Sequence, residues 1–167
     1  MGTHQSIENH LTHLRLRTHR KARAHYLASK SLSRKNIWFG ACVILISAFV
    51  GSSVVTDLSK SVTYLTPQVF GILSLIAAIL SSFQTFFGFS KLSEKHQGAA
   101  SQYSSLYRSL SLLNTKYFSG EYENKTILTQ LDEIQKTWNT VEHEAPDVPD
   151  SFYDKAKNEQ LSDDEGV

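Results

Sequence analysis

The sequence contains little cysteine, proline or glycine, and its middle third has almost no charge. Its 167 residues include one cysteine, three prolines and eight glycines. This composition excludes collagen-like, mucin-like and disulfide-stabilised proteins, and a lone cysteine cannot form an intramolecular disulfide. The length fits a single domain.

The net charge of +1 conceals three regions of different charge. Residues 1–36 carry eight Lys or Arg against Glu8, residues 37–90 carry only Asp57 and Lys60, and residues 91–167 carry eight Lys or Arg against fourteen Asp or Glu. The chain therefore has a basic arm, an apolar middle and an acidic C-terminal part. Such segregation points to different surroundings for the three regions.

The apolar middle predicts two membrane spans. A bilayer core of about 30 Å requires about 20 helical residues. Residues 36–56 carry no charge, and the next uncharged stretch is mostly apolar from Pro67 to Phe89. We therefore expect spans at residues 36–56 and 67–90, joined by a short external loop at 57–66. Lys and Arg flank the spans on the side of both termini, which predicts cytoplasmic termini and insertion into the cell (inner) membrane.

Outside the spans the sequence predicts further helices. Residues 1–35 form a basic helix continuous with the first span, since no Gly or Pro lies between Thr3 and Gly40. Residues 91–149 form cytosolic helices, and residues 150–167 form an acidic, mobile tail. The predicted fold is an all-α membrane protein: a two-transmembrane helical hairpin with long cytosolic extensions and a third amphipathic cytosolic helix.

A heptad pattern follows the second span. Its members alternate at spacings of four and three residues: Leu92, His96, Ala99, Tyr103, Leu106, Leu110 and Leu113. Continued backwards, the helix enters the second span without interruption. This pattern predicts a cytosolic oligomer seam, or equally a seam between helices of one chain. The third helix, from Asn124 to about His143, needs a partner for its one apolar face, which comprises Ile127, Leu131, Ile134, Trp138 and Val141.

The second span also has a stripe of small and hydroxylic residues. The stripe comprises Gly71, Ser74, Ala78, Ser81, Thr85 and Gly88, with Ser82 beside it and Gln84 as the only amide within the apolar core of either span. Such a stripe allows close helix packing or lines a water-filled path. One hairpin cannot enclose a pore, so conduction requires several copies.

The sequence gives no sign of catalysis. It lacks a phosphate-binding glycine loop, an HExxH motif and a nucleophile elbow, so we expect neither an enzyme nor a cofactor or metal. The basic arm precedes a span, and its position predicts a surface that faces anionic lipid rather than nucleic acid. The lipid-facing residues of this arm are Arg17, Arg20, Lys21, Arg23, Arg34 and Lys35.

The order of these segments resembles the SLATT family, the two-transmembrane effector domains associated with SMODS nucleotide synthases and SLOG sensors. The resemblance rests on the basic helix, the two spans with a short loop, the stretch from Leu92 to Arg108 with His96 and Tyr103, and the Ala145-Pro146-x-x-Pro149 ending. It implies an oligomeric, pore-forming or otherwise membrane-perturbing effector of bacterial antiviral defence, triggered by a nucleotide signal or partner. A separate sensor or nucleotide-synthase chain would supply the trigger. The alternative is a non-conducting membrane-anchored scaffold whose cytosolic helices recruit a soluble partner.

Overall fold

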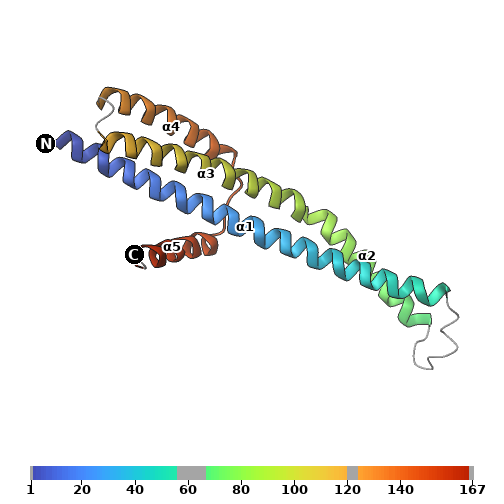
Figure 1. Cartoon of the computed structure of the whole chain (residues 1–167). Helices are drawn as coiled ribbons and strands as arrows, with labels where there is room; N and C mark the ends of the chain where they lie inside the picture. Colours follow the sequence, from blue (N-terminus) through green and yellow to red (C-terminus); the bar gives the residue numbers. More distant parts are fainter. Residues whose placement is uncertain (1, 56–66, 120–123, 166–167) are drawn as a thin grey trace. The chain divides into compact units, whose positions relative to one another are not determined.

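The described part of the protein consists of helices and short connections, without a strand. This computed structural model describes residues 2–55, 67–119 and 124–165 (Figure 1). The helices are α1 (Gly2–Val55), α2 (Pro67–Phe87), α3 (Phe89–Phe118), α4 (Asn124–Glu144) and α5 (Asp150–Glu165). The predicted all-α fold is confirmed. The helix predicted to begin at Asn124 is α4, and it begins at this residue. The predicted loop at 57–66 lies outside the described residues.

The chain divides into two compact units. The first consists of Met1–Lys30 and Ser93–Val167, and the second of Ser31–Leu92. The first unit thus contains the N-terminal half of α1, most of α3, and α4 and α5. The second contains the rest of α1, α2 and the first turn of α3. As predicted, the basic arm and the first apolar span belong to one helix.

The hydrophobic core of the first unit lies where α1, α3 and α4 meet (Figure 1). Each helix contributes an apolar face, and the buried residues are Ile7, Leu11, Leu14, Ala22, Tyr103, Leu106, Leu110, Leu113, Ile127, Leu131, Trp138 and Val141. A polar side chain enters this face at Thr18, whose hydroxyl donates to the Leu14 carbonyl oxygen at 2.7 Å. Burial of these faces removes apolar surface from water and stabilises the unit.

The heptad seam of α3 is used inside one chain. Six of its seven residues are buried in the first unit, from His96 to Leu113, while Leu92 is exposed. Their side chains pack among helices of the same chain and are unavailable to a second copy. The interpretation as an oligomer seam is therefore wrong, and the alternative of an intramolecular seam describes the structure.

Residues 150–165 form α5, so the prediction of a mobile tail is wrong for this segment. Pro149 precedes the helix, and Asp150 places a negative charge in its first turn, where the helix dipole favours it. Ala156 and Gln160, four residues apart, are buried. The covered face of α5 joins the half-buried Phe152 and Tyr153 to one small and one polar residue, so its apolar residues are too few for a clear hydrophobic periodicity.

In the second unit α1 packs against α2 along one face of each helix. The half-buried residues of α1 recur at Asn36, Val43, Ile46 and Val50, a spacing typical of one helix face. On α2 the corresponding face comprises Phe70, Leu73, Ala77, Leu80 and Gln84. Aromatic contacts hold both ends: Phe49 lies 6.0 Å from Phe70, and Phe39 lies 5.7 Å from Phe89, between ring centroids.

A glycine separates α2 from α3, contrary to the prediction of one uninterrupted helix. Gly88 has φ of +54°, in the left-handed region that side chains disfavour. Two backbone hydrogen bonds cross this position, from Gly88 N–H to the Gln84 oxygen at 3.3 Å and from Leu92 N–H to the Gly88 oxygen at 3.0 Å. The spacing of small residues predicts Gly88 as a member of the stripe. Its conformation instead shows that Gly88 allows the backbone to break between α2 and α3.

Substitution of Gly88 tests this role. We expect Gly88→Ala to lower stability by about 1–2 kcal/mol, because a Cβ disfavours the left-handed conformation. The matched control is Gly98→Ala in α3, where a Cβ would meet no atom within 4 Å. That change should raise stability by roughly 0.5–1 kcal/mol, since alanine favours a helix. Thermal unfolding in detergent micelles measures both, and equal effects would contradict the role of Gly88.

Candidate functional site

The second unit presents an apolar surface of the kind that faces lipid. The two helices of this unit are long and apolar enough to cross a membrane, and most side chains of their apolar stretches are exposed. Leu45 is 70% exposed, Leu75 61% and Phe86 83%. A soluble protein rarely exposes a continuous apolar surface of this kind. The surface therefore defines a membrane-inserted hairpin.

A polar contact lies inside this hairpin. The Gln84 amide nitrogen donates to Asn36 Oδ1 at 3.1 Å, and the Gly40 Cα faces the same amide, since a Cβ there would lie 3.5 Å from Gln84 Nε2. Lipid offers an amide no hydrogen-bond partner, whereas this helix–helix contact does. Gln84 therefore belongs to the α1–α2 interface.

The small-residue stripe lies on a different face of α2. Gly71, Ser74, Ala78, Ser81 and Thr85 are all exposed, and so is Ser82, whereas Gly88 at the break is half-buried. The stripe is thus not covered by α1 of the same chain. Three of its hydroxyl groups are satisfied locally: Ser74, Ser82 and Thr85 donate to carbonyl oxygens one turn earlier, at 2.8–3.1 Å. The face can therefore meet lipid or another helix without leaving these hydroxyls unpaired.

Much of the basic arm contacts protein. Arg20 Nε donates to Gln160 Oε1 at 2.7 Å, and Arg23 pairs with Glu159 at 2.6 Å. Both partners lie on α5. The prediction that these two residues face lipid is therefore wrong, because α5 occupies their side of α1. Arg34 and Lys35 are exposed in the second unit, directly before the apolar span, and the prediction of lipid contact remains for them.

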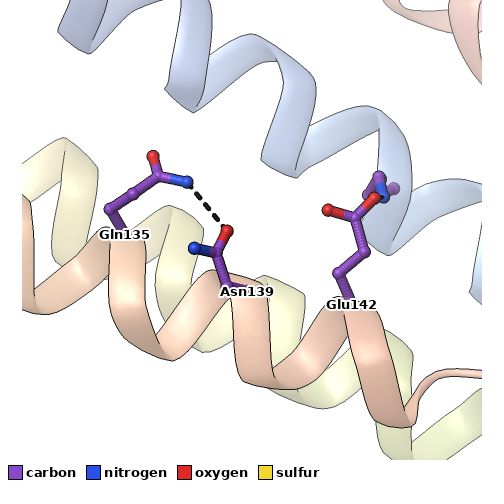
Figure 2. Close-up of polar contacts among 4 residues, drawn as sticks. Gln135, Asn139 and Glu142 are labelled. Carbon is purple, nitrogen blue, oxygen red and sulfur yellow. Dashed lines mark hydrogen bonds and ion pairs between the residues drawn. The ribbon is translucent and has the colours of Figure 1, made fainter.

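Two further cations of the arm meet α4. Arg17 lies over the Trp138 ring at 4.6 Å, and Lys21 lies over the same ring at 4.6 Å. Lys21 also pairs with Glu142. Figure 2 shows Glu142 reaching from α4 toward the neighbouring helix, with Gln135 and Asn139 bonded to each other farther along the same side. These cation–π and ionic contacts join α1 to α4. The assignment of Lys21 to lipid is wrong, because its ammonium group contacts Trp138 and Glu142, whereas lipid contact by the exposed Arg17 stays a prediction.

A buried polar layer joins α1 to α3. The Nδ1 atoms of His25 and His96 lie 3.1 Å apart, and His25 stacks on the Tyr103 ring at 5.5 Å. One turn away, Ser93 Oγ donates to the Ser29 carbonyl oxygen at 3.0 Å. Burial, the neighbouring His96 and Lys21 lower the pKa of His25 to about 4, and burial also lowers the pKa of His96. Both rings are therefore neutral near pH 7.

Fold and surface together define a membrane protein with two spans and a helical bundle. The chain belongs to the SMODS and SLOG-associating 2TM effector domain family, family 4, whose model matches residues 12–166. This match confirms the suspected family. No curated protein and no solved structure matches the chain.

Several residues of these contacts were not predicted. His25 and Asn36 carry no motif, and Trp138 was expected only as an apolar residue. Gln160 lies in the segment expected to be mobile. The available signal was spacing: Thr18, Ala22, His25 and Ser29 recur at helical intervals, so the buried face of α1 could have been extended through its polar members.

Proposed function

We propose that this membrane effector acts as a homo-oligomer that forms a pore or otherwise perturbs the inner membrane. It has no catalytic role, and both termini lie in the cytoplasm. A nucleotide signal or a partner chain triggers it as part of antiviral defence. The observation that supports this proposal best is the exposed small-residue face of α2, which runs from Gly71 to Thr85.

The stripe supports association of several chains. Helices in lipid associate through close packing of small residues and interhelical hydrogen bonds, because lipid is as apolar as leucine. A stripe already covered by α1 could not serve this purpose, but this one lies on a neighbouring face. A single hairpin cannot surround an aqueous path, so a pore needs neighbouring copies. The α1–α2 face with Gln84 holds each hairpin together, and the stripe would join hairpins.

The first unit supports a control role. Its core is formed within one chain, so it folds around its own helices and does not depend on a second copy for burial of the α3 seam. It therefore offers a folded part through which a trigger can act on the spans. This arrangement favours an effector over a simple anchor, because an anchor requires no small-residue face.

Bulky residues in the stripe test the proposal. We expect the triple variant Ser74→Leu, Ala78→Leu, Ser81→Leu to abolish growth arrest when the protein is overproduced in a bacterial host, because leucine prevents close approach. The rate at which cells lose membrane potential should fall at least about tenfold, and so should the rate of dye release from reconstituted liposomes. The measurements compare equal amounts of membrane-inserted protein.

The matched control enlarges a different face of α2. Ile72→Phe with Ile79→Phe alters exposed residues away from the stripe and should retain activity. A toxic triple variant, or intact membranes at full expression of the natural protein, would contradict the proposal. Preserved function after replacement of both spans with an unrelated hairpin would instead favour the scaffold alternative.

A further inference from the structure

An open pocket of about 480 Å³ lies beside the N-terminal half of α1. Its polar lining comprises His10, His13, Arg17 and Arg20 of α1 and Gln135 of α4, and two leucine side chains add an apolar wall. The four basic residues are separated by three, four and three positions, so they share one helix face. The volume is in the range of small-molecule sites.

The charge of this pocket is not balanced by a carboxylate among the residues that the structure describes. Farther along α1, Lys21 and Arg23 pair with Glu142 and Glu159. Arg17 instead rests on the Trp138 ring, and Arg20 donates to the amide oxygen of Gln160. Both of these partners are neutral. The two guanidinium groups are thus positioned by protein contacts while their positive charge remains available.

A second groove, between α3 and α4, provides a comparison. It has a volume of about 730 Å³ and its lining includes Glu133, Glu144 and Lys136, so negative charges predominate there. Among the residues that the structure describes, no aspartate or glutamate lines the first pocket. The contrast shows that basic residues do not predominate in every groove of the unit.

We propose that this pocket binds the phosphate groups of a soluble, phosphate-bearing small molecule. Guanidinium groups match phosphate oxygens through paired N–H donors, and Arg17 and Arg20 would supply them. His10, His13 and Gln135 would add N–H donors at the rim, and the apolar wall suits the rest of the ligand. This inference rests on the proposed function, because it identifies where a soluble trigger would bind.

Lipid headgroups carry the same phosphate chemistry but fit the position less well. Asn36, the first residue of the span, follows Arg20 by 16 residues, whereas Arg34 and Lys35 directly precede the span. The pocket also joins α1 to α4, since Gln135 is part of its lining. A ligand that bridges both helices stabilises the folded unit by preferential binding.

Calorimetric titration of the full chain in neutral detergent tests the proposal, with inorganic tripolyphosphate as the probe. We expect saturable binding that weakens with added salt. Arg17→Gln with Arg20→Gln should lower affinity at least about tenfold, because hydrogen bonds between charged groups are lost. His10→Gln with His13→Gln alters exposed side chains and should weaken binding severalfold with unchanged thermal stability.

The matched control is Lys21→Gln with Arg23→Gln, which removes the same charge outside the pocket and should leave affinity within about twofold. No binding by the natural protein, or equal losses in the control, would overturn the proposal. Competition by phosphatidylglycerol vesicles, but not phosphatidylcholine vesicles, would also overturn it in favour of a lipid headgroup. If tripolyphosphate binds but no dye is released, the proposed function is contradicted and the binding site is supported. If dye is released but tripolyphosphate does not bind, the binding site is contradicted and the proposed function is supported.

Discussion

Leu110→Ala should destabilise the first unit by about 2–5 kcal/mol. Leu110 is fully buried in the core formed by α1, α3 and α4. Truncation removes buried apolar surface and leaves a cavity that the surrounding helices fill only in part. The full chain in detergent, with Trp38→Phe as background, makes Trp138 the remaining tryptophan. Trp138 is buried in the same core, so its fluorescence during denaturation follows this unit.

The matched control is Leu112→Ala on the same helix. Leu112 is 58% exposed, so its truncation should change stability by no more than about 0.5 kcal/mol. Equal effects of the two variants would mean that the α3 seam is not buried within one chain. That result would support the interpretation of the heptad as a contact between chains of an oligomer.

Acidification should destabilise the first unit through His25. The folded state holds this ring neutral down to about pH 4, because burial, His96 and Lys21 lower its pKa. In the unfolded chain the ring takes up a proton near pH 6.5, so the unfolded state binds more protons between these values. Stability should therefore fall as the pH drops from about 6.5 to about 4, by on the order of 3 kcal/mol.

A variant separates His25 from other titrating groups. His25→Gln retains a hydrogen-bonding side chain next to His96 and cannot take up a proton, so most of the pH dependence should disappear. His143→Gln changes an exposed histidine of α4 and should leave the dependence intact. Thermal unfolding from pH 7 to pH 5 provides the measurement, and a natural protein with constant stability over this range would contradict the prediction.

Much of the fold followed from periodicity. Uncharged runs identified the apolar helices, and the spacing of Ile127, Leu131, Trp138 and Val141 identified the buried face of α4. Periodicity could not decide whether the α3 seam joins helices of one chain or of several, because both arrangements bury the same residues. It also missed α5, because the covered face of this helix joins Phe152 and Tyr153 to Ala156 and Gln160 and has few apolar residues at helical spacing.

The candidate sites were predictable to a lesser extent. Spacing identified the stripe of α2, but not which face α1 covers, since that depends on how the hairpin packs. Lys21 and Arg23 were expected to face lipid because they precede a span. Their carboxylate partners, Glu142 and Glu159, are more than 100 positions away in the sequence, and only the tertiary fold brings them together.

The glycine break also constrains how deeply the hairpin sits in the bilayer. At Gly88 the chain leaves the α-helical conformation, so the regular pairing of each N–H with the carbonyl oxygen four residues earlier is interrupted between α2 and α3. Peptide groups that lack a partner are costly in hydrocarbon, so we expect this break to lie where water reaches it. Lys91 follows within one turn and also requires a polar environment. We therefore expect Gly88 to mark how deeply the hairpin is inserted, at the level of the hydrated headgroup layer.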